Sequence, residues 1–371
     1  MEEEKLPMEV MMEILSRLPV KSLSRFRCVS KTWLKLFTCD DPYFSKLNAN
    51  HNANYNPTHP GILFTDLKFG VFYVADYNVI DKAERLPFQT STLNDYKIVA
   101  ICNGLVCFRD SYLNVYIWNP IIQDHITIPC SPLPSHFTTS NNTLFGFGFH
   151  QGTNEYKVIR IVWSCEKNSE GFQSHVSVYT LGTNSTWRIL PDYLSGMKYA
   201  YEPSVLVTGA LHWIAARTLG SCVIVSFDME HEFFKEIPQP TGIEYKYARI
   251  VRVGNMGGYL SLSYSIHKGN VHIWQMKEYG VVESWTQQYV IGQTEIPGSL
   301  SWLFLVGTVN DGEIIIMKSL KEFILYNPKN HSIRNLHTSE FTLKNAYTYI
   351  GSLVSPTVID KKTFKTEEGG S

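Results

Sequence analysis

The stretch NGLVCFRDSYLNVYIWNPIIQDHITIP, residues 103–129, contains three short apolar or alternating segments separated by turn residues. The first segment, NGLVCF, carries a glycine suited to a tight turn, and VYIWNPIIQDHITIP at 115–129 reads as a hairpin. One more segment, YKIVAI, precedes them from residue 96. Runs of this length are typical of β-strands and too short for helices, so the stretch predicts a unit of about four strands.

The hairpin of this unit recurs along the chain. Hairpins of similar sequence begin at residues 115, 176, 223, 271 and 323, at spacings of 61, 47, 48 and 52 residues. In four of the five units a strand led by glycine precedes the hairpin, starting at residues 103, 209, 257 and 311. Four-stranded units with a period near 50 residues indicate a β-propeller with blades of kelch size.

A sixth unit can be assembled from both ends of this β-rich region. GILFTDL from residue 61, FGVFYVADY from residue 69 and the chain up to Leu86 supply its first strands, while AYTYIGSLV at 346–354 supplies one from the far end. Pairing of the two ends would close the ring and remove an exposed sheet edge. We therefore expect a large all-β domain that forms a six-bladed, propeller-like ring. A β-sandwich or several smaller β domains is the alternative.

Composition and charge argue against several classes of protein. The chain has 371 residues, with 33 Lys and Arg against 34 Asp and Glu, so a net charge of -1 gives no reason to expect a nucleic-acid or membrane partner. The acidic start MEEEKLP is unlike a secretory signal, and no apolar run approaches the roughly 18 residues of a membrane span. The seven cysteines are scattered without a CxxC pair, as in proteins with reduced thiols. We expect an intracellular protein of the cytoplasm and/or nucleus.

A dense helical pattern precedes the β-rich region. Within residues 5–18, Pro7 suits a first helical position and Pro19 ends the helix. Its apolar side chains cover an arc of about 200°, whereas a surface helix needs a stripe of about 100°. Two more short helices are expected, at 21–29 and after Ser30, which can cap the third. Three short helices cannot bury the whole arc among themselves. Either the body of the same chain covers the rest, or another chain does.

The helical stretch resembles a known module. LPMEVMMEILSRLPVKSLSRFRCVSKTW at 6–33, followed by DDPYF at 40–44, is similar without a gap to the F-box in the form common among plant F-box proteins. The resemblance implies that this three-helix module binds the Skp-type adaptor of a Skp-cullin-F-box ubiquitin ligase and, through it, the cullin. The adaptor contacts it implies are Leu6, Pro7, Ile14, Leu15, Leu18, Pro19 and Leu23. Trp33 can instead hold the three helices together, and Met8, Met12 and Phe26 are assigned to neither role.

The β-rich region resembles the F-box-associated domain of plant F-box proteins, including the S-locus F-box group and relatives in defence signalling. The resemblance rests on an ordered set of strings between residues 96 and 356, among them VYIWNP, GALHWIA and IVSFDMEHEFFKEIP. It implies a kelch-like propeller that binds a protein. The expected organisation is an F-box helical domain at 1–47, a linker at 48–60, the propeller-like domain at 61–356 and a flexible tail at 357–371, which together make an α+β chain.

A search for catalytic or metal-binding patterns identifies none of the usual arrangements. The chain lacks GxxxxGK[ST], GxSxG and HExxH. GFGFHQG at 146–152 is better explained by an alternating strand than by a phosphate loop. His267 and His272 have no third ligand at a suitable spacing, and Cys102 and Cys107 are expected in the core. We expect no catalytic residue, no metal and no cofactor. A basic helical face, Lys21, Arg25, Arg27, Lys31 and Lys35, is interpreted as solvated.

These observations together predict a non-catalytic subunit of a ubiquitin ligase complex, in which the head docks on the adaptor and the propeller binds a target protein. The alternative is a propeller-type ligand sensor or scaffold that does not act through ubiquitin. The sequence does not identify the target, its pathway or the residues that bind it. Loops at 131–143, 164–174 and 242–247 are candidates for target binding by length and polarity alone.

Overall fold

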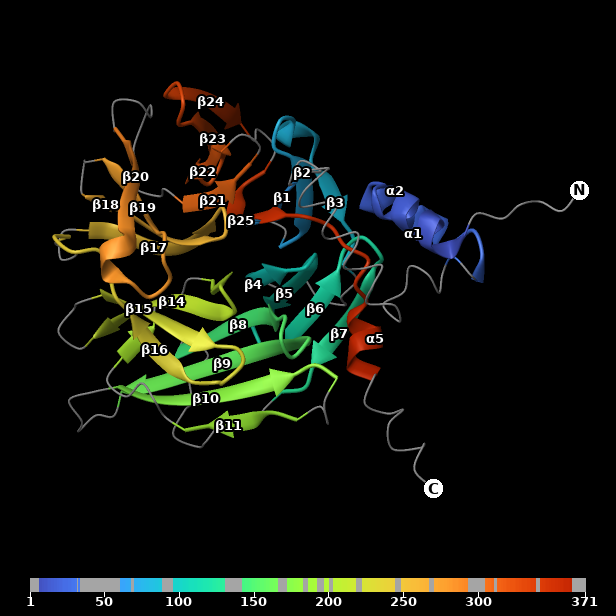
Figure 1. Ribbon diagram of the computed structural model, residues 1–371, viewed down its shortest axis with the longest axis horizontal. Helices are drawn as coiled ribbons and strands as arrows, with labels where there is room; N and C mark the ends of the chain where they lie inside the picture. The colour runs from blue at the N-terminus through green and yellow to red at the C-terminus, as the bar shows by residue number, and fades with distance from the viewer. Residues whose placement is uncertain are drawn as a thin grey trace, which may run out of the picture.

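The β-rich region forms six antiparallel sheets around a common axis in the computed structural model, so the six-bladed β-propeller is confirmed (Figure 1). The structure describes residues 7–31, 33, 61–67, 70–88, 96–130, 142–165, 172–182, 186–191, 197–199, 203–217, 222–243, 248–266, 270–292, 304–309, 312–337 and 341–361. The expected linker and the three candidate target loops lie wholly or mainly outside these residues. Within them, no helix is long and apolar enough to cross a membrane.

The first three blades follow the strands expected from the sequence. Blade 1 contains β25 (Leu343–Tyr349), β1 (Gly61–Asp66), β2 (Phe72–Asp76) and β3 (Glu84–Leu86). Blade 2 contains β4 (Lys97–Cys102), β5 (Leu105–Arg109), β6 (Val115–Asn119) and β7 (Asp124–Ile128). Blade 3 contains β8 (Thr143–His150), β9 (Glu155–Cys165), β10 (Phe172–Thr180) and β11 (Arg188–Leu190). GFGFHQG therefore belongs to strand β8 and the turn after it.

The other three blades repeat this order with one irregularity. Blade 4 contains β12 (Met197–Tyr199), β13 (Val205–Val207), β14 (Ala210–Arg217), β15 (Cys222–Asp228) and β16 (Phe234–Ile237). Blade 5 contains β17 (Ala248–Met256), β18 (Tyr259–Ile266), β19 (Val271–Met276) and β20 (Trp285–Ile291). Blade 6 contains β21 (Phe304–Thr308), β22 (Ile314–Ser319), β23 (Glu322–Asn327) and β24 (Ser332–His337). In blade 4, β12 and β13 both pair with β14 and together take the place of one inner strand.

The two ends of the β-rich region meet in blade 1. Strand β25 pairs antiparallel with β1, with Gly61 opposite Tyr349 and Leu63 opposite Tyr347. Strand β25 also lies beside β21 of blade 6 and β4 of blade 2, so it completes the inner ring. Closure by strands from opposite ends of the region is thus confirmed, because β25 covers the edge that β1 would otherwise expose.

The core of the propeller consists of clusters of apolar side chains between neighbouring blades. Strand β5 shows the pattern: Leu105 and Cys107 pack toward blade 3, while Val106 and Phe108 pack toward blade 1. Because both faces of each sheet are covered, successive residues are apolar and LVCF shows no polar alternation. Cys102 and Cys107 lie in this core as expected, and burial raises the pKa of the Cys102 thiol to about 12.

Among the residues that the structure describes, helices α1 (Met8–Ser16), α2 (Val20–Phe26) and α5 (Pro356–Lys361) lie outside the sheets. Helices α1 and α2 lie at the side of the propeller near blade 1, and helix α5 packs on β6 and β7 of blade 2 (Figure 1). We expected a flexible tail from residue 357, but the structure continues in helix α5 to residue 361. A six-residue helix has too little apolar periodicity to be recognised in the sequence, and its N-terminus is stabilised by residues of blade 2.

Candidate docking surface on the N-terminal helices

The N-terminal head, defined here as residues 7–33, begins with two short helices that proline residues delimit. Pro7 precedes α1 and accepts a hydrogen bond from Met11 N at 3.1 Å, and Pro19 precedes α2 and accepts one from Ser22 N at 2.8 Å. A carbonyl before the first helical turn can accept such bonds while the proline ring fixes φ. The paired Leu-Pro motif therefore sets where both helices begin.

The start of the third helix is described as far as Trp33. The Ser30 hydroxyl accepts a hydrogen bond from Trp33 N at 3.1 Å, which is the capping contact expected from the sequence. The Trp33 ring packs edge-on against Phe26 of α2, with ring centroids 5.3 Å apart. Trp33 and Phe26 therefore join the helices to one another. Residues 34–60, including Lys35 of the basic face, lie outside the described residues.

One side of the head packs on the propeller. Met12, Leu15, Val20 and Leu23 are buried in a cluster with Leu353, which follows strand β25. Ile121 and Ile122, in the turn between β6 and β7, pack against the same cluster. The body of the same chain thus covers part of the wide apolar arc.

The other side of helix α1 remains exposed. Val10 and Ile14 lie one turn apart and retain 44% and 51% of their surface exposed. Together with Glu9, Glu13 and Arg17 they line a shallow groove. An ion pair of 2.7 Å joins Arg17 Nη2 to Glu13 Oε1 at the edge of this groove. The groove has an apolar floor and a charged rim, which is the anatomy of a protein-binding surface.

The structure divides the expected adaptor contacts between the two sides. Pro7, Ile14 and Pro19 are exposed, and Leu18 is half-buried, whereas Leu15 and Leu23 are buried against the propeller and within the head. Leu6 lies outside the described residues. Sequence reasoning did not assign Val10 to the adaptor, although its spacing of four residues from Ile14 places both side chains on one face of the helix.

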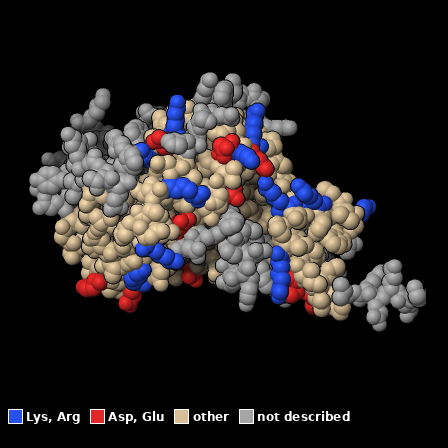
Figure 2. Space-filling model, turned by 90° about the horizontal axis from the view of Figure 1, so that it is seen from above, with Lys and Arg blue, Asp and Glu red and all other residues tan. Residues whose placement is uncertain are grey.

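Of the described residues of the basic face, Lys21, Arg25 and Lys31 are exposed, whereas Arg27 is half-buried. Lys21 Nζ lies 2.8 Å from Glu84 Oε2 on strand β3, and both side chains are largely exposed. Figure 2 shows lysine and arginine side chains interspersed with aspartate and glutamate on this face of the molecule. Exposed pairs of this kind contribute little to stability, and no uninterrupted basic surface is visible in this view.

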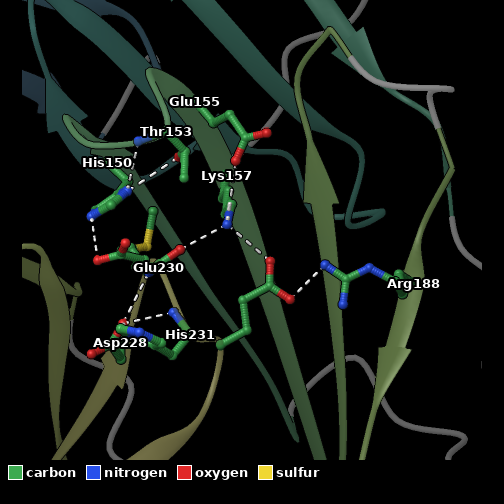
Figure 3. A network of polar contacts seen from close by, with 10 residues as sticks. His150, Thr153, Glu155, Lys157, Arg188, Asp228, Glu230 and His231 are labelled. Atoms are coloured by element: carbon green, nitrogen blue, oxygen red, sulfur yellow. Dashed lines mark hydrogen bonds and ion pairs between the residues drawn. The ribbon is translucent and has the colours of Figure 1, made fainter.

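A network of charged side chains joins strands β9 and β11 of blade 3 to the turn between β15 and β16 of blade 4 (Figure 3). The Lys157 ammonium donates to Met229 O at 2.7 Å and to Glu232 Oε1 at 2.9 Å, and the Glu232 carboxylate also accepts from Arg188. These two cations hold the pKa of Glu232 below its usual range, against the effect of burial. Lys157 and Arg188 of blade 3 both contact Glu232 of blade 4, so the network joins the two blades.

The candidate metal pair is not supported by the described residues. His272 on β19 stacks on Tyr264 with ring centroids 4.9 Å apart, and burial lowers its pKa. Its expected partner His267 lies outside the described residues. Among the residues that the structure describes, no group of three or more His, Cys, Asp or Glu side chains is placed to hold a metal ion.

Comparison with protein families agrees with both parts of this architecture. Residues 68–358 match the F-box associated beta propeller domain, and residues 4–45 match the F-box domain. The chain belongs to the F-box proteins with an F-box associated propeller. The first of these matches covers most of the chain and begins within blade 1, whose inner strand returns from residues 343–349.

Three proteins of Arabidopsis thaliana are similar to this F-box protein over most of their length. F-box protein At3g07870 is 29% identical, covering 90% of this chain and 87% of its own. F-box/kelch-repeat protein At3g23880 is 28% identical, and the match covers 95% of this chain and 96% of the relative. F-box protein CPR1 is 26% identical, and the match covers 80% of this chain and 76% of the relative. In each case the similarity extends over three quarters or more of both chains.

Proposed function

We propose that this F-box protein is the substrate-recognition subunit of a Skp-cullin-F-box ubiquitin ligase. The head binds a Skp-type adaptor, which connects it to the cullin, and the propeller binds a target protein. Ubiquitin is transferred by other subunits, so this chain contributes proximity and no catalytic step. Tethering raises the effective concentration of target lysines near the conjugating enzyme.

The two-sided packing of helix α1 carries this proposal. Its inner side rests on the propeller, while Val10 and Ile14 on the outer side form an apolar strip that the described part of the chain leaves exposed. Exposure of such side chains is unfavourable in water, and burial of the exposed half of each would contribute about 1 kcal/mol. A partner that covers the strip is therefore favoured, and the F-box family membership indicates the Skp-type adaptor.

Binding of the purified adaptor to the full-length chain tests the proposal. Ile14→Asp places a charge at the centre of the strip, and we expect it to weaken binding at least about 30-fold, as for a central interface residue. Ile189→Asp is the matched control, because Ile189 is 65% exposed on the outer strand β11, away from the head. The control should bind like the wild type. Wild-type binding that Ile14→Asp leaves unchanged would contradict the proposed surface, and no wild-type binding would contradict the adaptor role.

Target binding needs a separate experiment. The full-length Ile14→Asp variant should still bind targets through the propeller but should not pass them to the ligase. Targets should therefore accumulate on this variant and be depleted on the wild type when ubiquitin transfer is active. A propeller that captures only small ligands, with no ubiquitinated protein, would instead favour a ligand sensor.

A further inference from the structure

The C-terminal segment 350–361, here called the clasp, runs from the last strand of the ring across blade 2 to helix α5. It crosses the turn between β4 and β5, where the Ser352 hydroxyl donates to Asn103 O at 2.6 Å. Gly104 in this turn has a φ of +73°, and a Cβ there would lie 2.4 Å from Ser352 Oγ. The absence of a side chain at Gly104 therefore allows the clasp to lie directly on the turn.

Polar side chains of blade 2 hold the clasp at two points. The Asn119 amide donates to Ser352 O at 2.9 Å and to Val354 O at 2.8 Å. The Asp124 carboxylate accepts hydrogen bonds from the hydroxyls of Ser355 and Thr357, and from Thr357 N at 3.3 Å at the start of α5. A carboxylate at this position satisfies the first turn of the helix and complements its dipole.

Leu353 lies between Ser352 and Val354, the two residues that Asn119 holds, and it packs against the head. Leu353 is only 6% exposed and lies in one cluster with Met12 and Leu15 of α1 and Leu23 of α2. The other propeller residues in this cluster, Ile121 and Ile122, are partly buried and come from the turn that precedes Asp124. Lys21 of α2 makes an ion pair with Glu84 of β3, but both side chains are exposed, so this contact contributes little. Leu353 is therefore the central residue of the seat on which the head rests.

We propose that the clasp couples the head and the propeller into one rigid body through Leu353, with the Val10 and Ile14 side of α1 facing outward. This inference rests on the proposed function in one respect: it implies that a target on the propeller is held in a fixed orientation relative to the adaptor. The segment 350–361, which follows the last strand of the ring, thus determines how the two domains are arranged, although it belongs to neither the repeat nor the three-helix module.

A distance measurement between two spin labels tests this coupling in the full-length chain. Cys28 in the head and Cys130 after strand β7 are both exposed and can carry the labels, with Cys39→Ser, Cys165→Ser and Cys222→Ser removing other thiols. The unmodified clasp should give one narrow distance distribution. Leu353→Asp should broaden it, because burying an unpaired carboxylate in this cluster is unfavourable. Ile350→Asp is the control, since Ile350 is 49% exposed on the same segment, and its distribution should remain narrow.

A second variant covers the case in which Leu353→Asp prevents folding. Asp124→Asn changes the anchor on blade 2 without touching the head, and it should also broaden the distribution while the propeller unfolds in one transition. Narrow distributions in both variants would overturn the proposal. Adaptor affinity measured on the same proteins should equal that of the wild type, because the outward side of α1 is unchanged. A broadened distance distribution in the variants together with normal adaptor binding supports the clasp. If neither the wild type nor the variants bind the adaptor, the proposed function is refuted, but the clasp is not.

Discussion

The imidazole of His212 on strand β14 lies with its Nε2 2.8 Å from the hydroxyl of Tyr279, and its Nδ1 3.2 Å from Val205 O. A neutral imidazole can donate from Nδ1 to Val205 O and accept from the Tyr279 hydroxyl. His212 is fully buried between blades 4 and 5, so a protonated, charged imidazole there would lose its hydration by water, which is unfavourable. Burial lowers the pKa of His212 to about 4.

This buried histidine predicts acid sensitivity of the propeller. Because its pKa is lower in the folded state than the usual 6.5, the unfolded chain takes up the proton first as the pH falls. Stability should therefore decline from pH 6.5 toward pH 4, by on the order of 3 kcal/mol from this group. Denaturant unfolding across this window measures it, and His212→Gln should flatten the profile. An equal slope in the variant and the wild type would assign the acid sensitivity to other groups.

The ion network between blades 3 and 4 predicts unequal effects of two substitutions. Glu232→Ala removes the main carboxylate partner of the Lys157 ammonium, whose side chain is only 4% exposed, and should destabilise the propeller by about 3 kcal/mol. Arg188→Ala removes an exposed partner of the same carboxylate and should cost less than about 1 kcal/mol. Equilibrium unfolding in urea compares the two variants. Equal effects would show that Lys157 does not depend on Glu232.

Close packing at Gly146 predicts that replacing this glycine in β8 destabilises the protein. A Cβ at Gly146 would lie 2.5 Å from Trp213 Cζ2, in the core between blades 3 and 4. Gly146→Ala should therefore destabilise the protein by about 1–3 kcal/mol, because Trp213 is fully buried and cannot move aside. Gly148→Ala, two residues along the same strand, meets mobile methyl groups at 3.2 Å or more and should cost less. Thermal unfolding of both variants checks the order, and a reversed order would contradict this packing.

Thiol labelling of the native protein should separate exposed from buried cysteines. Cys28 and Cys130 are exposed and should react readily with a maleimide, whereas Cys102 and Cys107 are buried and have raised pKa values. The two buried thiols should be labelled only after unfolding. Mass spectrometry of digested samples measures this for each site, with denatured protein as the control for intrinsic reactivity. Rapid native labelling of Cys107 would show that blade 2 opens.

Much of the propeller could be predicted because its information is local. A glycine such as Gly209 marks a turn, the apolar run after it marks a strand covered on both faces, and the spacing of such runs counts the blades. Blade 4 departs from the rule because two short strands, β12 and β13, take the place of one inner strand, and no periodic signal in the sequence predicts this division. Helix α5 was missed because the residue that caps it, Asp124, lies more than 200 residues earlier.

The candidate docking surface was predicted only in part. The width of the apolar arc on α1 showed that the head needs a further covering surface, and the family resemblance named the residues. It did not distinguish Leu15 and Leu23, which are buried, from Ile14, which is exposed, because all three are apolar residues of the same motif. Val10 illustrates the converse case, since its exposure became apparent only when the head was seen packed on the propeller.

By itself, the sequence determined the two domains, the six-fold repeat and the closure of the ring, because strand length, turn residues and helix ends depend on neighbours along the chain. Only the tertiary structure decided which side of helix α1 faces its own propeller and which faces outward. Hydrophobic burial is non-directional, so a pattern of apolar residues states how much surface must be covered but not what covers it. Leu353, more than 300 residues from the head in the sequence, packs against the inner side of α1 and so leaves the other side facing outward.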